Sequence, residues 1–236
     1  MEIRGFIENS LLEWEGHLSC VVFVPGCNLR CRFCHAAHLL GPSCLESIGE
    51  GQILRYMRRQ ADWLDGAVIT GGEPTLHGED LIDFAGRVHE IGLKVMVETN
   101  GTQPNWVRRL VAGSHADAIA MDVKAPLTPE HYARITHREV DVEDVRCSLQ
   151  SIIEGEIPHE FRITVVPGLI GRKEVRSIAP ALEGAEHVAI QNFQPEHTLD
   201  KSLRRTLPYR PHQMDAIAEE LKGTGARISV RGRERG

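Results

Sequence analysis

Short apolar runs alternate along the chain with longer segments whose apolar residues recur at helical spacing. Strands are expected at 18–24, 67–70, 94–99, 118–123, 161–166 and 187–191, after a weaker leading strand within 2–8 and before a short one at 227–230. Amphipathic helices are expected at 46–60, 79–90, 104–111, 142–153, 173–182 and 214–222. This alternation is typical of a mostly parallel α/β sheet with crossover helices.

The number of strand–helix units limits the choice of architecture. Six or so units after residue 18 are too few to close an eight-unit barrel. We therefore expect an α/β fold in the form of a partial (β/α)6 TIM-like barrel that is open on one side, with a doubly wound sheet as the alternative. A single domain is expected over 1–236, with a core at about 18–192 and a C-terminal extension at 193–236 that carries no recognisable motif.

Composition and charge exclude several classes of protein. The formal net charge of −6 argues against nucleic-acid binding, which needs a concentrated basic face, and the basic group 231–235 is interpreted as a solvated tail. No apolar run approaches the roughly 20 residues of a membrane span. The chain begins without the apolar region of a secretory signal, so a cytoplasmic location is expected.

Three of the six cysteines crowd together after the first strong strand, at the spacing C-x3-C-x2-C: Cys27, Cys31 and Cys34. The scattered Cys20, Cys44 and Cys147 are interpreted as structural, a pattern that suits a reducing compartment.

The number of crowded cysteines indicates the kind of metal site. Structural zinc sites and electron-transfer [4Fe-4S] clusters normally take four ligands. His35 directly follows Cys34, and Cys44 could close the set only if the intervening loop folded back. Three thiolates leave one metal position open, which favours a catalytic site. A non-catalytic zinc or iron–sulfur module is the alternative.

Glycines and polar residues gather where the predicted strands end. They are Gly71–Pro74, Glu98–Gly101, Asp122–Lys124, Arg162 on the fifth strand, and Gln191 with Asn192. Parallel α/β barrels assemble their chemistry at these carboxyl ends. We therefore expect these groups to share one site with the cysteines, with a strand-end ion pair as the alternative for Asp122 and Lys124.

Two motifs resemble the radical S-adenosylmethionine (SAM) superfamily. Cys27, Cys31, Phe33 and Cys34 match its C-x3-C-x-aromatic-C signature, and Gly71-Gly72-Glu73-Pro74 matches its G-G-E-P motif. The resemblance implies a [4Fe-4S] cluster whose open iron is chelated by the amino and carboxylate groups of SAM. It also implies that Gly71, Gly72 and Glu73 bind the methionine amine and that Phe33 packs against adenine.

Further residues are similar to one subset of that superfamily, the activases of glycyl radical enzymes. Their pattern D-T-N-G followed by D-x-K is matched by Thr99-Asn100-Gly101, Asp122 and Lys124, with Glu98 in place of the first aspartate. Arg162 opens a stretch similar to their R-x-x-V-V-P-G, and His35 is retained from C-H-N while the asparagine is not. The resemblance places Thr99, Asp122, Lys124, Arg162 and His35 in the SAM pocket, with a possible monovalent cation held by Glu98 and Asp122.

The resemblance implies a specific reaction and two partners. SAM would be cleaved reductively to a 5′-deoxyadenosyl radical, which abstracts hydrogen from a glycine of a larger glycyl radical enzyme, as in the activation of anaerobic ribonucleotide reductase. A flavodoxin or ferredoxin would supply the electron. A radical SAM enzyme acting on a small molecule, similar to 7-carboxy-7-deazaguanine synthase, is the alternative.

Overall fold

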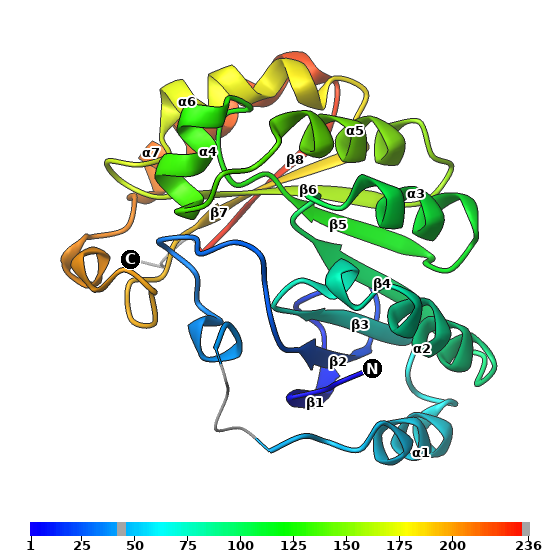
Figure 1. The fold of residues 1–236 in the computed structure, drawn as a ribbon. Coiled ribbons are helices and arrows are strands. Elements are labelled where there is room, and N and C mark those ends of the chain that lie inside the picture. The colour runs from blue at the N-terminus through cyan, green and yellow to red at the C-terminus, as the bar shows by residue number, and fades with distance from the viewer. Residues whose placement is uncertain (42–45, 233–236) are drawn as a thin grey trace.

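The structure, a computed structural model, describes residues 1–41 and 46–232. Eight strands form one sheet in chain order: β1 (Gly5–Ser10), β2 (Ser19–Val24), β3 (Gly66–Gly71), β4 (Lys94–Thr99), β5 (Ala118–Asp122), β6 (His159–Val165), β7 (His187–Asn192) and β8 (Arg227–Arg231). β1 pairs antiparallel with β2, and each later pair of neighbours is parallel. The described strands leave β1 unpaired with β8, so the barrel is open, as predicted (Figure 1).

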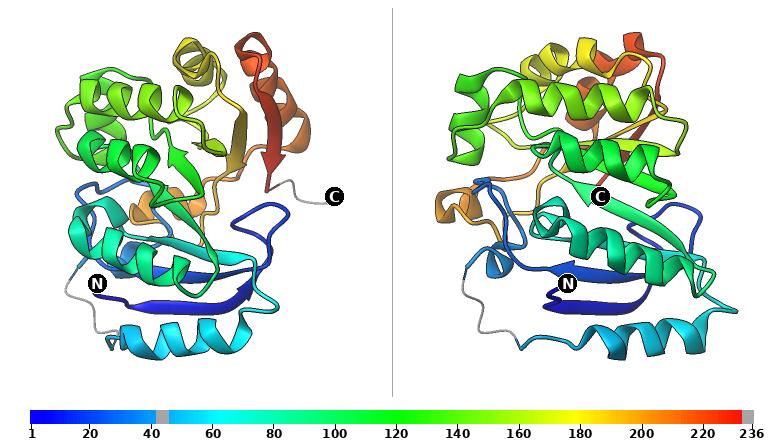
Figure 2. Two further views of the ribbon diagram at one scale, coloured as in Figure 1. Left: turned by 90° about the vertical axis from the view of Figure 1, so that its right-hand side faces the viewer. Right: turned by 45° about the vertical axis from the view of Figure 1, so that its right-hand side comes forward.

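The helices cover the outer face of the curved sheet (Figure 2). They are α1 (Glu50–Gln60), α2 (Glu79–His89), α3 (Pro104–Ala112), α4 (Pro129–Thr136), α5 (Val142–Ile153), α6 (Arg172–Ile178) and α7 (Pro211–Ala218), with 3-10 turns η1 (Ala37–Leu39), η2 (Pro74–His77), η3 (Ala179–Leu182), η4 (Lys201–Arg205) and η5 (Glu219–Thr224). The sequential strand order rules out the doubly wound alternative, in which the order reverses at a switch point.

Several predicted boundaries differ from the observed ones. α1 begins at Glu50 rather than at residue 46, and α7 begins at Pro211 rather than at 214. The helix expected at 173–182 changes to the 3-10 turn η3 after Ile178, because Pro180 has no N–H to donate to the preceding turn. The sequence analysis missed α4 altogether. In addition, β8 pairs in parallel with β7, so the C-terminal extension completes the sheet.

Alternation along the strands separates two layers of side chains. Val22, Val24 and Ile69 belong to the large core between the sheet and the helices. Val68, Met96 and Ala120 belong to a small apolar cluster on the inner face of the barrel. Two residues further along the same strands, the inner face becomes polar with Thr70, Glu98 and Asp122, since residues i and i+2 share a face. The barrel interior therefore has an apolar floor and a polar upper end.

Among the described residues there is no helix with both the length and the apolar character that crossing a bilayer requires.

Candidate active site

A cavity of about 430 Å³ lies where the parallel strands end. Its volume falls in the range of roughly 300–1,000 Å³ that small-molecule sites have. All predicted site residues except Pro74 line it: Cys27, Cys31, Phe33, Cys34, His35, Gly71, Gly72, Glu73, Glu98, Thr99, Asp122, Lys124 and Arg162. Pro74 instead begins the 3-10 turn η2. The fold thus brings side chains from five strands to one place.

The cysteine loop, residues 25–36, is held by the end of α4, the helix that the sequence analysis missed. The backbone N–H groups of Arg30 and Arg32 donate to the carbonyls of Thr136 and Ile135, at 2.8 and 3.0 Å. The Arg30 guanidinium also donates to the carbonyl of Cys27, at 2.6 Å. These bonds fix the loop's shape independently of any ligand.

The three thiols of the loop are free; Cys31 is buried, and Cys27 and Cys34 are half-buried. Burial raises the pKa of Cys31 to about 12 and raises the pKa of Cys27 and Cys34 as well, against the opposing effect of the Lys124 charge. A bound metal reverses this preference because it coordinates thiolates. The thiols therefore suit metal ligands better than free nucleophiles.

The spacing of the thiols distinguishes a cluster from a single ion. The three Sγ atoms do not all lie within 4.8 Å of one another, whereas a zinc ion with bonds of about 2.3 Å keeps its sulfur ligands within about 4.6 Å. The wider arrangement fits an iron–sulfur cluster better than a single zinc ion.

The candidates for a fourth protein ligand do not complete the set in the described part of the chain. His35 Nε2 accepts a hydrogen bond from the backbone N–H of Gln194 at 3.3 Å, and burial lowers the pKa of His35. The ring nitrogen facing Gln194 is thus already occupied. Cys44 lies outside the described residues. The donor set of three thiols fits a [4Fe-4S] cluster with one open iron.

The two glycines at the end of β3, Gly71 and Gly72, are required by a close backbone approach. A Cβ on Gly72 would lie 1.8 Å from the carbonyl oxygen of Gly26, and Gly71 has a φ of +119°. The N–H groups of Gly72 and Glu73 donate to Val24 and Gly26, at 2.8 and 2.7 Å. Because these amides are used within the protein, carbonyl groups are what this turn can offer to a ligand ammonium.

The Glu73 carboxylate is buried and accepts four hydrogen bonds from the protein. The donors are the N–H and hydroxyl of Thr75 at 3.1 and 2.6 Å, the hydroxyl of Thr99 at 2.7 Å, and the N–H of Asn100 at 2.7 Å. Burial raises the pKa of Glu73, while the hydrogen bonds act in the opposite direction. The side chain joins the ends of β3 and β4, and its predicted contact with a ligand ammonium stays a prediction.

Asp122 and Glu98, the two predicted ligands of a monovalent cation, are each paired with a basic residue. Lys124 Nζ lies 2.8 Å from Asp122 Oδ2, and although burial opposes its charge, Asp122 and the nearby thiols raise the pKa of Lys124. Glu98 accepts from the Thr70 hydroxyl at 2.6 Å and pairs with Arg162. The strand-end ion pair between Asp122 and Lys124 is therefore present. The monovalent cation stays a prediction, because both of its proposed ligands already have cationic partners.

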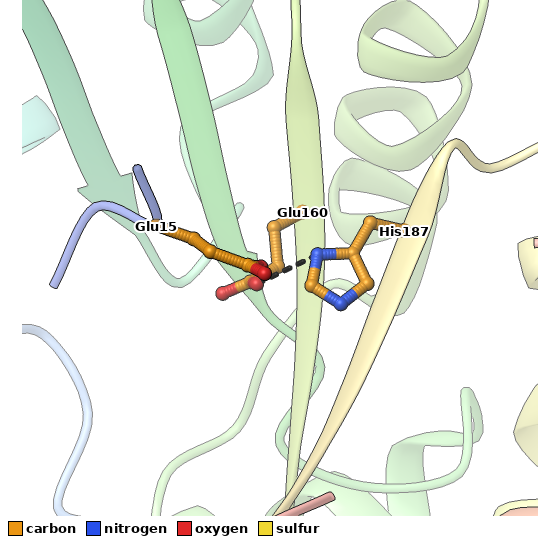
Figure 3. Close-up of side chains that lie close together, drawn as sticks. All are labelled: Glu15, Glu160 and His187. Atoms are coloured by element: carbon orange, nitrogen blue, oxygen red, sulfur yellow. Dashed lines mark ion pairs between the residues drawn. The ribbon is translucent and has the colours of Figure 1, made fainter. Parts of the chain in front are cut away.

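A second cluster of polar side chains extends from Arg162 into the barrel. Glu160 pairs with Arg162 and with both Nη atoms of Arg231, the latter at 2.8 and 2.6 Å. It also pairs with His187 Nδ1 at 2.9 Å (Figure 3). Burial opposes the charge of Glu160, but the bond from His187 and the two guanidinium groups lower its pKa to about 2. We call these residues the Glu160 network.

Glu15 adds a third potential metal ligand beside Glu160 and His187, within 4.8 Å (Figure 3). Arg227, however, donates to Glu15 at 3.2 and 3.0 Å, just as Arg162 and Arg231 neutralise Glu160. The surrounding guanidinium groups make this an ion-pair network rather than a cation site.

Several residues of the cavity were missed by sequence reasoning. Arg231 was interpreted as part of a solvated tail, but it lies on β8, pairs with Glu160 and lines the cavity. The C-terminal extension also reaches the cysteine loop: the N–H groups of Leu199 and Asp200 donate to the carbonyls of Cys34 and Arg32, at 3.2 and 2.9 Å. These contacts join residues about 165 positions apart, so no local pattern could reveal them.

Together, the open parallel barrel and its three-cysteine cavity define a class of protein. Residues 21–175 match the profile of the Radical SAM superfamily. The chain therefore belongs to the radical SAM superfamily, as its cysteine and G-G-E-P motifs predicted.

Curated relatives narrow the comparison. A putative glycyl-radical enzyme activating enzyme of Methanocaldococcus jannaschii is 28% identical over 209 residues, which cover 86% of this chain and 84% of the relative. The pyruvate formate-lyase-activating enzyme of Clostridium pasteurianum is 26% identical over 210 residues, or 86% of each chain. A 7-carboxy-7-deazaguanine synthase of Bacteroides thetaiotaomicron is 39% identical, but over only 88 residues, 35% of this chain and 43% of the relative.

Solved structures share the fold at low sequence identity. QueE from Escherichia coli matches 97% of this chain and 92% of its own, with a TM-score of 0.56 and 17% identity. Streptococcus suis SuiB bound to S-adenosylmethionine matches 90% of this chain and 52% of its own, with a TM-score of 0.64 and 14% identity. These similarities support the partial barrel.

Proposed function

We propose that this protein activates a glycyl radical enzyme, of the type that serves anaerobic ribonucleotide reductase. When bound, the [4Fe-4S] cluster supplies one electron to SAM, which splits into methionine and a 5′-deoxyadenosyl radical that takes a hydrogen atom from a glycine of the partner enzyme. The observation that carries this proposal is the single cavity that combines three free cysteines with the G-G-E-P turn and the Asp122–Lys124 pair.

The residues of the cavity have separate tasks in this proposal. Cys27, Cys31 and Cys34 would hold the cluster. The carbonyl groups of the turn at Gly71 and Gly72 would accept from the methionine amine. The ammonium of Lys124 would face the carboxylate or ribose of SAM, and the buried ring of Phe33 would pack against adenine.

The size and openness of the site favour a protein substrate. A cavity of about 430 Å³ has little room for a second small molecule once a cluster and SAM are bound. The described strands leave the barrel unclosed between β1 and β8, which agrees with a site that a peptide loop enters. The two curated relatives that cover most of the chain carry names of activating enzymes.

The proposal requires an electron donor, for which a flavodoxin or ferredoxin is expected. The family pattern also implies a monovalent cation beside SAM, with Glu98 and Asp122 as its ligands. We place the protein in the cytoplasm, because cysteines that serve as metal ligands must stay reduced.

Spectroscopy of the partner enzyme tests the proposal directly. The protein would be reconstituted with iron and sulfide without oxygen, reduced, and mixed with SAM and a glycyl radical enzyme from the same cell. We expect 5′-deoxyadenosine together with the doublet of a glycyl radical in electron paramagnetic resonance. Formation of 5′-deoxyadenosine with no radical on any such enzyme contradicts the activase assignment.

A small-molecule reaction is the second candidate, because part of the chain is 39% identical to a 7-carboxy-7-deazaguanine synthase. Turnover of a low-mass substrate in the absence of a partner protein would favour it. Reconstitution with bound zinc and no iron would instead favour a non-catalytic module.

A further inference from the structure

The segment 194–210 forms part of the molecular surface next to the cysteine loop. Besides the two backbone bonds to Cys34 and Arg32, Asp200 pairs with the Arg32 guanidinium at 2.7 Å. Figures 1 and 2 show η4, within this segment, beside the cysteine loop. The segment therefore provides a short hydrogen-bonded connection from the surface to the backbone of Cys34, one of the proposed cluster ligands.

The same segment has a charge opposite to that of the molecule. Lys201, Arg204, Arg205 and Arg210 are exposed, and none forms an ion pair with another described residue. No acidic residue occurs between positions 201 and 214, whereas the whole chain has a net charge of −6. Leu207 adds an exposed apolar side chain, 83% accessible. We call residues 201–210 the basic segment.

We propose that the basic segment is the docking surface for an acidic protein that donates electrons one at a time. This inference rests on the proposed function, which requires one electron from outside: the donor is oxidised by one electron, the cluster is reduced by one, and no bond is formed. Opposite charges around two redox centres steer association and raise its rate by up to about 10³-fold at low ionic strength.

A charge-reversal experiment with a matched control tests the docking surface. The triple variant K201E/R204E/R205E is compared with R55E/R58E/R59E, which makes the same change in net charge on the exposed face of α1, away from the cysteine loop (Figure 1). Stopped-flow absorbance measures cluster reduction by an acidic flavodoxin and by a small chemical reductant.

We expect the first variant to be reduced at least tenfold more slowly by flavodoxin at low salt, with a difference that shrinks as salt is added. Reduction by the chemical reductant and by flavodoxin in the α1 variant should stay unchanged. Equal slowing in both variants, or no slowing in either, overturns the proposal. The proposal is also overturned if K201E/R204E/R205E accepts electrons normally from flavodoxin but, after chemical reduction, fails to activate the glycyl radical enzyme. The failure of activation in every protein, wild type included, would instead count against the proposed function.

A second, independent observation concerns Asn100, which directly follows β4. The Asn100 side chain is buried, and its Oδ1 accepts from the N–H and the hydroxyl of Thr102, at 3.0 and 2.6 Å. A backbone N–H can only donate, so this contact fixes the orientation of the amide. Its Nδ2 must therefore face Cys27 Sγ at 3.7 Å and Asn28 Oδ1 at 3.0 Å.

The geometry points to Asn100 as a positioning residue that tunes the potential of the cluster through the Cys27 thiolate. Hydrogen bonds to the sulfurs are among the factors that set iron–sulfur potentials, because they stabilise the more negative, reduced state. The donor is preorganised, since Thr102 and Asn28 hold the amide and the Asn100 N–H is bound to Glu73.

Potentiometric titration followed by electron paramagnetic resonance tests this role without SAM or a partner enzyme. Removing the donor in Asn100→Leu should lower the potential, by about a tenfold change in the reduction equilibrium, which is 59 mV for one electron. Asn100→Val also lacks the donor and adds no charge, so it serves if the leucine variant does not fold.

Thr102→Val provides the matched control. It removes a hydroxyl from the same network but keeps the Thr102 N–H and the contact between Asn100 and Cys27. We expect a lower unfolding temperature with an unchanged potential. An unchanged potential in both Asn100 variants, or an equal shift in Thr102→Val, overturns the assignment, whereas the radical SAM assignment would stand in either case.

Discussion

The upper end of the barrel and the Glu160 network both bury polar side chains, but they differ in how these groups are paired. In the Glu160 network, the Glu160 carboxylate has two arginine partners, and His187 contacts both Glu160 and the Ser229 hydroxyl, the latter at 2.8 Å. At the cavity, three free thiols lie together without a disulfide. Buried polar groups that hydrogen-bond or ion-pair with one another stabilise the fold. Free metal-ligating atoms that gather in a cavity instead indicate a binding site.

Arg162 connects the two regions, because it pairs with Glu98 at the cavity and with Glu160 in the network. The comparison therefore predicts that changes at the cysteines affect chemistry and leave stability nearly intact. Changes in the Glu160 network should lower stability and leave the chemistry nearly intact.

The largest effect is expected for Cys31→Ala. Loss of one of three ligands should reduce bound iron from about four per chain to a small fraction and abolish SAM cleavage, while circular dichroism shows a folded protein. Cys147→Ala, on the exposed face of α5, is the matched control and should keep both iron and activity. Retention of SAM cleavage by the Cys31 variant would contradict the cluster assignment.

Gly72→Ala should lower both the stability of the fold and the binding of SAM. Its methyl group would have to occupy space 1.8 Å from the Gly26 carbonyl, so either the cysteine loop or the G-G-E-P turn must move. We expect a loss of roughly 3 kcal/mol in the free energy of unfolding, measured in urea, and a loss of SAM binding. Gly86→Ala on α2 meets no atom within 4 Å and should instead stabilise by about 0.5–1 kcal/mol. Normal SAM binding by the Gly72 variant would show that this close approach is not needed.

Glu160→Gln should destabilise the protein by about 3 kcal/mol near pH 7, because it leaves buried guanidinium groups without their partner. The wild-type carboxyl has its pKa lowered from 4.5 to about 2, so its contribution is complete above pH 4.5 and is lost as pH falls toward 2. Urea titrations at several pH values should therefore show the gap between the two proteins closing over that interval. A gap independent of pH would contradict the ion-pair explanation.

The smallest effect is expected for Ser229→Ala on β8, which removes the hydroxyl that is hydrogen-bonded to His187 on β7. Thermal unfolding should reveal a loss of about 1 kcal/mol, with iron content and SAM cleavage unchanged. A loss of bound iron in this variant would mean that the two regions are coupled more tightly than their pairing suggests.

Local sequence patterns predicted the architecture because the strands are short apolar runs bounded by glycine and proline, and the helices have regular apolar spacing. α4 was missed because its eight residues begin at Pro129 in a polar stretch, where the capping Thr128 is the main signal. The cavity residues were predicted because parallel strands place their carboxyl ends at one edge, so motif residues at those ends had to meet.

By itself, the sequence determined the family, the cysteine set and the alternation of strands and helices, since each depends on residues close together in the chain. The tertiary structure alone decided that Glu73 joins two strands, that Arg231 reaches the cavity, and that residues 194–210 lie against the cysteine loop. These features depend on hydrogen bonds and ion pairs between distant segments. Such pairs form only after the sheet has brought its strand ends together, so no local pattern specifies them.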